Sequence, residues 1–139
     1  MANDNKRFGT LYEHAFVVEA LRRGLQPHMP VGDYMPHDIV VYNSEGVCFR
    51  VQVKGTSYLV KRPGNSPPRF KVVAKAGGNI KPIDCSVVDV IAAYVAPLDT
   101  WYLVPCPATE SIRSLWLYPL SPDSSAKYEK YKEEWGVFD

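Results

Sequence analysis

Apolar and polar residues alternate along residues 49–54, and this pattern predicts a β-strand with two chemically different faces. The apolar face holds Phe49, Val51 and Val53, and the polar face holds Arg50, Gln52 and Lys54. Because Gln52 and Lys54 would project to the same side, they are placed to act on the same object. A solvated polar face of an edge strand is the alternative interpretation of this pattern.

A second strand is predicted over residues 38–42, joined to a strand over residues 47–54 by the link Asn43-Ser44-Glu45-Gly46. The asparagine and glycine in this short link predict a tight hairpin. If Asn43 pairs with Val47, Asp38 lies opposite Gln52 and shares its face. A slip of one residue would separate them, so the inference depends on the turn.

A helix is predicted over residues 8–23, ending at Gly24. On a helical projection Glu13 falls inside the apolar arc, beside Phe16 and Ala20. A carboxylate that faces the core is costly unless a cation, a metal ion or several hydrogen-bond donors meet it. The alternative is a boundary glutamate that reaches solvent or pairs with an arginine.

The rest of the chain predicts a loop, more strands and a last helix. We expect a loop over 26–36, strands over 70–76, 89–96, 101–104 and 115–120, a short helical turn over 83–88, and a helix over 124–135. No internal repeat or linker divides the chain, so residues 1–139 are expected to form a single domain.

Composition fits this expectation, with 139 residues, 46% of them hydrophobic and 22% charged. There is no charged-then-apolar leader and no long apolar run, so we expect a cytoplasmic protein without a membrane span. The three cysteines, Cys48, Cys85 and Cys106, match no zinc-binding spacing and are expected to be reduced.

The net charge is only +1, but its distribution is uneven. Residues 46–83 contain eight lysines and arginines and no acidic residue. This segment would form either a basic face for phosphates or a solvated loop. The candidates for DNA contacts within it are Thr56, Ser57, Lys61, Arg62, Arg69, Lys71 and Lys75.

Together these residues suit phosphodiester hydrolysis, which needs a hard cation held by oxygen ligands and a group that positions water. Asp38 and Glu13 supply carboxylates, while the Gln52 side chain and the Val53 backbone supply neutral carbonyl oxygens. Lys54 can orient the attacking water and balance charge on the phosphate.

At these positions the sequence resembles the PD-(D/E)XK nuclease superfamily. Pro36-His37-Asp38 stands for the first acidic motif, Gln52-Val53-Lys54 for the second, and Gly9-x-x-x-Glu13 for the helical acid. The chain is most similar to the small branch with Gln-x-Lys, that of group I intron homing endonucleases, and is related to archaeal Holliday-junction resolvases, which keep an acid where Gln52 stands. The resemblance covers about residues 8–105, and residues 106–139, where a strand and a helix are expected, match nothing in that family.

The resemblance implies an α/β fold with a restriction-endonuclease-like core, αβββαβ, whose mixed central sheet is flanked by helices. It also implies a Mg²⁺-dependent endodeoxyribonuclease, with Mn²⁺ as a possible substitute, acting on duplex or branched DNA as a homodimer or higher homo-oligomer. The expected catalytic residues are Glu13, Asp38, Gln52 and Lys54, and the expected metal ligands are Asp38, Gln52, Val53 and Glu13.

Because Gln52 replaces the usual acid, an inactive nuclease-fold module that binds DNA or a protein is an alternative. A metal-binding or interaction domain unrelated to nucleic acid is a third.

Overall fold

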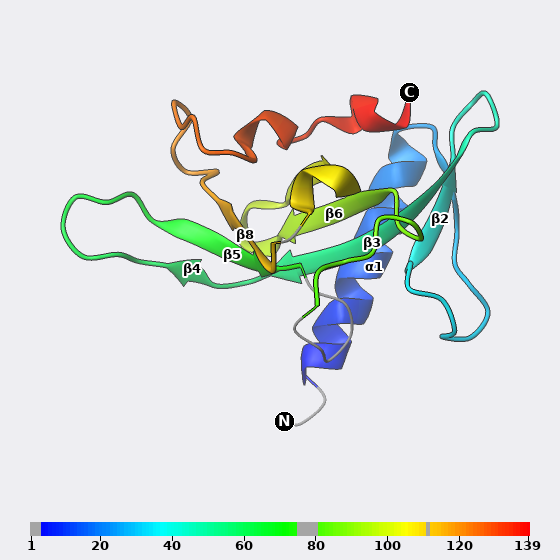
Figure 1. Ribbon diagram of the computed structural model, residues 1–139, viewed down its shortest axis with the longest axis horizontal. Helices are drawn as coiled ribbons and strands as arrows, with labels where there is room; N and C mark the ends of the chain where they lie inside the picture. Colours follow the sequence, from blue (N-terminus) through cyan, green and yellow to red (C-terminus); the bar gives the residue numbers. More distant parts are fainter. Residues whose placement is uncertain (1–3, 75–80, 111) are drawn as a thin grey trace.

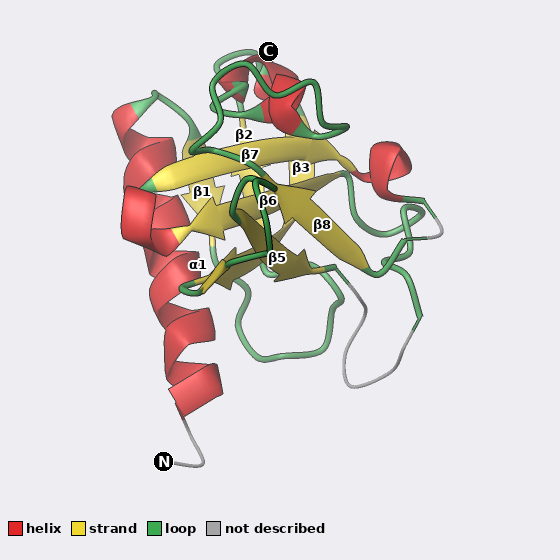
Figure 2. Cartoon of the chain, turned by 90° about the vertical axis from the view of Figure 1, so that its left-hand side faces the viewer, coloured by secondary structure: helices red, strands yellow, loops and turns green. Residues whose placement is uncertain are grey.

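The long helix α1 (Asp4–Arg22) packs against one face of a five-stranded sheet, and a smaller three-stranded sheet packs against the other face (Figures 1 and 2). The computed structural model describes residues 4–74, 81–110 and 112–139. The central sheet has the order β1 (Gln26–His28), β2 (Ile39–Tyr42), β3 (Cys48–Thr56), β6 (Val90–Val95) and β7 (Thr100–Pro105). The smaller sheet has the order β4 (Leu59–Val60), β5 (Arg69–Val73) and β8 (Ser114–Leu117).

The predicted hairpin and its register are confirmed. Strands β2 and β3 are antiparallel, with Ile39 opposite Val51. The Asn43 N–H donates to the Val47 carbonyl at 3.0 Å, and the Asn43 side-chain oxygen accepts the Val47 N–H at 2.9 Å. The asparagine therefore closes the turn with both its backbone and its side chain, which prevents the one-residue slip that would separate Asp38 from β3.

The mixed sheet is confirmed as well, because β3 and β6 are parallel while the other pairs of the central sheet are antiparallel. A parallel pair needs a long crossover connection, usually a helix. Here β4, β5 and a turn at residues 84–87 lie between β3 and β6, and none of the described residues of this connection is helical. In the part of the chain that the structure describes, the second helix of the expected αβββαβ order is therefore missing.

Alternation along the strands builds a separate core on each face of the central sheet. Val90 and Ala92 of β6 pack toward α1 with its buried Phe16, while Ile91 and Ala93 pack toward the smaller sheet. Because both faces are covered, β6 is buried at nearly every position, as is usual for a strand inside a layered α/β fold.

Helix α1 begins at Asp4, four positions before the predicted start at residue 8. The first turn is polar, so hydrophobic periodicity could not reveal it. The Asp4 carboxylate at the positive end of the helix dipole and its ion pair with Arg7 at 3.8 Å both favour a helix there. The predicted loop over 26–36 is also partly wrong, because Gln26–His28 forms β1 against β2.

The predicted helix over 124–135 is wrong. This part of the chain contains only turns and the short 3-10 helices Glu129–Tyr131 and Trp135–Phe138. The Glu133 N–H donates to the Trp101 carbonyl at 2.7 Å, and the Glu133 carboxylate accepts the Trp101 N–H, also at 2.7 Å. The segment thus lies along β7 and forms hydrogen bonds with backbone groups on the edge of this strand. These tertiary hydrogen bonds override the local preference for a helix.

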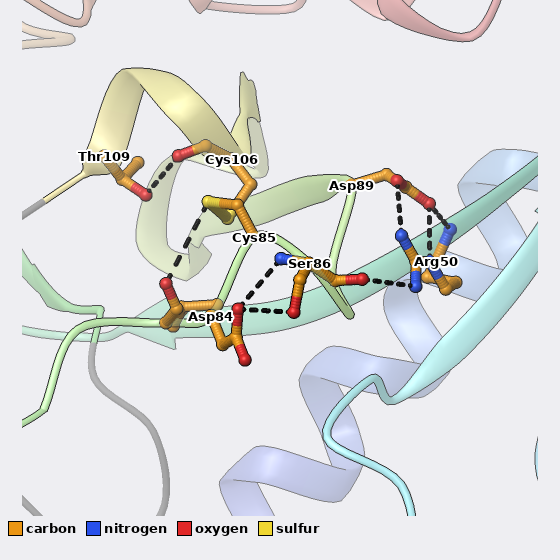
Figure 3. Close-up of a disulfide and its surroundings, with 8 residues drawn as sticks. Arg50, Asp84, Cys85, Ser86, Asp89, Cys106 and Thr109 are labelled. Carbon is orange, nitrogen blue, oxygen red and sulfur yellow. Dashed lines mark hydrogen bonds and ion pairs between the residues drawn. A yellow bond between two sulfur atoms is a disulfide. The ribbon is translucent and has the colours of Figure 1, made fainter.

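The expected reduced state is wrong for two of the cysteines, because Cys85 and Cys106 form a disulfide (Figure 3). The Cys106 N–H donates to the Asp89 carbonyl at 2.9 Å, so the end of β7 lies beside the turn that precedes β6. A separation of 21 residues in the sequence gives no sign of this proximity. Cys48 is a free, exposed cysteine.

Among the described residues, no helix is long and apolar enough to cross a membrane.

Candidate active site

Asp38 lies directly before β2, at the point where β3 continues past its partner strand. Its backbone N–H donates to the Val51 carbonyl at 2.9 Å, which extends the pairing of β2 with β3 by one position. One oxygen of its carboxylate accepts the Val53 N–H at 2.8 Å. The carboxylate is therefore fixed against the edge of β3 and does not move freely in solvent.

The same edge presents the backbone carbonyl of Val53. In a β-strand the N–H and the C=O of one residue point to the same side, and the Val53 N–H points toward Asp38. The β2–β3 pairing ends at Ile39 opposite Val51, so the Val53 carbonyl lies beyond the end of β2. The role of Val53 as a source of a backbone oxygen stays a prediction.

Glu13 approaches this edge from α1, where it is partly buried as its position in the apolar arc predicted. Glu13, Asp38 and Lys54 line one cleft of about 580 Å³. Its other lining residues come from α1, from the end of β3 and from β5: Asn5, Phe8, Gly9, Tyr12, Val53, Gly55, Thr56, Ser57, Tyr58, Lys71 and Val73. The structure thus brings together two acids and a lysine that are separated in sequence.

Both acids are destabilised in their charged form. Burial raises the pKa of Glu13, and repulsion from the Asp38 carboxylate raises it further. Burial also raises the pKa of Asp38, although its hydrogen bond from Val53 and the nearby Lys54 ammonium oppose this effect. The Asp33 carboxylate raises the pKa of both acids. A group of carboxylates that repel one another in a cleft is an environment that a bound cation would stabilise.

Gln52 is buried, with 8% of its surface exposed, and it is not among the residues that line the cleft. It sits between Val51 and Val53, which pack toward α1, so its side chain projects to the opposite face of the sheet. Lys54 lies two residues further on that face and reaches the cleft. The predicted Gln52 and Lys54 face is present, but only Lys54 lines the cleft.

The predicted DNA contacts fall into three groups. Thr56, Ser57 and Lys71 line the cleft. Lys61, Arg62 and Arg69 lie outside it, on β5 or on the loop that joins β4 to β5. Lys75 lies outside the described residues.

Some residues of the cleft were not expected from the sequence. The hydroxyl of Tyr12 shares a hydrogen bond of 2.6 Å with the hydroxyl of Ser57, and its ring lies against Gly55. Asn5 is a further unexpected residue of the wall, whereas Tyr58, which also lines it, follows Thr56 and Ser57 and was a candidate for a DNA contact with them. The lack of a side chain at Gly55 was visible in the sequence, but the residue that occupies the space is 43 positions away and left no local signal.

A larger depression of about 1100 Å³ lies along the N-terminal half of α1. Its lining includes a single carboxylate, Asp4, and basic residues such as Lys6 and Arg7. It lacks the combination of paired acids and a lysine, so the smaller cleft is the candidate active site.

Comparison with known proteins shows the family of the chain and a structure that shares its fold. The family model described as PD-(D/E)XK endonuclease matches residues 3–131. The chain is a member of the PD-(D/E)XK endonuclease family. The structure of a bacterial homing endonuclease, I-Ssp6803I, is similar over 95% of this chain and 90% of its own, with a TM-score of 0.75 and 23% sequence identity. That likeness shows a shared fold, and no curated protein matches the chain.

The residues of this PD-(D/E)XK endonuclease fit a hard divalent cation in part. Over residues 4–74, 81–110 and 112–139, no three histidine, cysteine, aspartate or glutamate side chains are grouped so that they could hold a metal ion. Asp38 and Glu13 would therefore share a divalent cation with neutral oxygens such as the Val53 carbonyl.

Proposed function

We propose that this protein is a divalent-metal-dependent DNA endonuclease that hydrolyses phosphodiester bonds in the cleft between α1 and the exposed edge of β3. The single observation that carries the proposal is the convergence of Glu13, Asp38 and Lys54 on one cleft. Membership of the PD-(D/E)XK endonuclease family supports nucleic acid as the substrate. Magnesium is the proposed cofactor, and manganese is a possible substitute.

The proposed division of roles follows from where each group is fixed. Asp38 and Glu13 would hold the cation, with the Val53 carbonyl as a further oxygen. A bound magnesium ion would supply a Lewis acid that polarises the scissile phosphate. The Lys54 ammonium can only donate hydrogen bonds, so it would orient the water and stabilise the negative charge that develops on the phosphate. Gln52 is buried and does not line the cleft, so the proposal gives it no direct part in holding the cation.

The proposal is tested by cleavage of plasmid, nicked, single-stranded and four-way-junction DNA in magnesium and in manganese. Lys54→Ala and Asp38→Ala should each lower the cleavage rate by about 10²–10⁴-fold while the circular dichroism spectrum stays native. Matched controls are Lys127→Ala and Asp123→Ala, which remove the same charges from exposed positions of the C-terminal segment. Unchanged cutting by Lys54→Ala would refute the mechanism.

A second candidate is an inactive module that binds DNA without cutting it. The observation in its favour is the neutral Gln52, which leaves two carboxylates in the cleft where the family pattern has a further acid. Calorimetry of magnesium and manganese binding separates the two candidates. If the wild type binds no cation and Gln52→Glu restores binding, the site has lost its activity; if the wild type binds, the enzyme is favoured.

A homodimer is proposed as the form that cuts both strands of a duplex, because the described residues of one chain bring Glu13, Asp38 and Lys54 together in a single cleft. Sedimentation of the protein with and without duplex DNA tests this state. A monomer that still makes double-strand breaks in a single binding event would contradict it.

A further inference from the structure

An arm projects from the body of the protein (Figure 1). Its base contributes to the wall of the candidate active site. The arm consists of β4, β5 and the loop 61–68 between them, and it spans residues 59–73. At its base, Lys71 and Val73 of β5 line the cleft, together with Tyr58, which precedes β4. A polymer that occupies the cleft will therefore meet the arm.

The charge of the arm fits a polyanion. Residues 59–73 hold four cationic side chains and no acidic one. These cations are Lys61, Arg62, Arg69 and Lys71. A basic element continuous with a cleft for a phosphodiester is the electrostatic pattern of a nucleic-acid contact.

The two arginines of the arm are held by neighbouring groups, Arg62 within the arm and Arg69 on and beside β8. Arg62 donates two hydrogen bonds to the Pro67 carbonyl, at 3.1 and 3.0 Å, which closes the loop. The guanidinium of Arg69 lies 3.6 Å from the centre of the Trp116 ring, and it donates to the Tyr118 hydroxyl at 3.3 Å. These contacts hold the arm in one shape before any ligand binds, which lowers the entropy cost of binding.

The tip of the loop presents neutral polar groups. Pro63 and Pro67 restrict its backbone, and Gly64 takes a positive φ of 72° at the turn. Asn65 and Ser66, which follow this turn, are exposed, as is Lys61 where the loop begins. An asparagine amide and a serine hydroxyl are groups that read the edges of bases, whereas a lysine recognises phosphate.

We propose that this arm enters the major groove of double-stranded DNA while a neighbouring phosphodiester lies in the cleft. Asn65 and Ser66 then contact base edges, and Lys61 contacts a phosphate. Val60 pairs with Arg69 where the loop leaves the smaller sheet, so the two sides of the loop start about 4.8 Å apart. The major groove of B-form DNA is about 12 Å wide, so the projecting loop fits. The inference rests on the proposed function for DNA as the ligand.

The length of the arm sets where it can read. At about 3.3 Å per residue, the stretch from Leu59 to Asn65 spans at most about 20 Å. This distance corresponds to about six base pairs along a duplex. The bases that the arm selects should therefore lie within about six base pairs of the bond that is cut.

Binding is measured in the Lys54→Ala background, so that no substrate is consumed. This protein and its Asn65→Ala/Ser66→Ala derivative are each used to select binders from a pool of randomised DNA duplexes. The parent should enrich a sequence motif, and the derivative should lose it, with binding of the enriched duplex about tenfold weaker. Lys61→Ala should weaken binding to all duplexes alike and lower the salt dependence of binding by about one ion. Lys127→Ala is the matched charge control.

The same motif from both proteins, or no motif from the parent, would overturn the inference. Equal binding of single-stranded DNA or of an RNA duplex would also overturn it, since a deep, narrow RNA major groove excludes the arm. If selection behaves as expected but the wild type cuts no DNA, the proposed catalysis fails while the arm's role stands. If the wild type cuts DNA but the arm variants bind DNA as the parent does, the proposed catalysis stands and the arm's role fails.

Discussion

The ring of Tyr12 lies against the backbone of Gly55, in the space that a side chain at position 55 would need. Gly55→Ala would force the ring to move and would break the hydrogen bond between Tyr12 and Ser57. We expect a loss of about 1–3 kcal/mol in the free energy of unfolding, measured in urea. Because Gly55 follows Lys54, we also expect slower DNA cleavage than in the wild type.

Two comparisons isolate this steric cause. Gly9→Ala, inside α1, would add a methyl group with nothing within 4 Å and should leave stability unchanged or raise it by about 0.5–1 kcal/mol. In a double-mutant cycle, Tyr12→Val should cost less in the Gly55→Ala background than alone. Strict additivity would show that the two residues do not compete for the same space.

Stability should depend on pH through Glu13. Its pKa is raised above the ordinary value of 4.5, so the fold favours the protonated form. The stability that this provides is present at low pH and is lost as pH rises through the raised pKa. Glu13→Gln should therefore melt close to the wild type near pH 4 and about 1–3 °C higher at pH 8, as scanning calorimetry would show.

With magnesium at pH 8, the wild type should melt above Glu13→Gln, because the cation stabilises the protein in which the ligand at position 13 is charged. The wild type should gain stability when magnesium is added, and Glu13→Gln should gain much less. Glu45→Gln, which removes an exposed carboxylate in the hairpin turn, is the control. A variant that is less stable than the wild type at pH 8 without metal would contradict the expectation.

The disulfide between Cys85 and Cys106 closes a loop of 21 residues. The entropy of loop closure gives a stabilisation of about 3 kcal/mol for this length. The double variant Cys85→Ser/Cys106→Ser, or reduction with a thiol, should lower the urea midpoint by a corresponding amount. Cys48→Ser should leave it unchanged, because that cysteine is free and exposed. Equal midpoints in oxidised and reduced protein would count against a structural role for the bond.

Arg50 and Asp89 join the starts of β3 and β6 through both side chain and backbone (Figure 3). The Asp89 carboxylate accepts hydrogen bonds from the Arg50 guanidinium at 3.0 and 2.9 Å and from its backbone N–H at 2.7 Å. These bonds lower the pKa of Asp89, so their stabilisation is present above its ordinary value and is lost as pH falls through the lowered one. Asp89→Asn should melt about 2–5 °C lower than the wild type at neutral pH, and its melting temperature should fall less on acidification than that of the wild type.

The control for this pair is Asp84→Asn, on the same turn, whose carboxylate bonds only to the nearby Ser86 among the described contacts. It should change the melting temperature less than Asp89→Asn does. A larger effect at Asp84 would show that the turn itself, rather than the link between strands, provides the stability.

The register of the hairpin was predicted on the condition that Asn43 pairs with Val47, and the structure confirms that condition. That register places Asp38 against β3, and helical periodicity places Glu13 toward it. The errors have a common origin in contacts between distant segments. The hydrogen bond from Trp101 to Glu133 holds the C-terminal segment along β7, where a helix was predicted. The disulfide between Cys85 and Cys106 could not be inferred from their spacing in the sequence.

The parallel pairing of β3 with β6 also bears on how this protein can change over evolution. A parallel pair demands a long connection, and here the arm is built from that connection. Residues inserted or lost between Leu59 and Arg69 alter neither the hairpin register nor the position of Asp38 relative to β3. The segment that would choose the target can thus diverge quickly while the machinery that would cut stays fixed, and chimaeras that exchange only this loop are a direct route to new specificities.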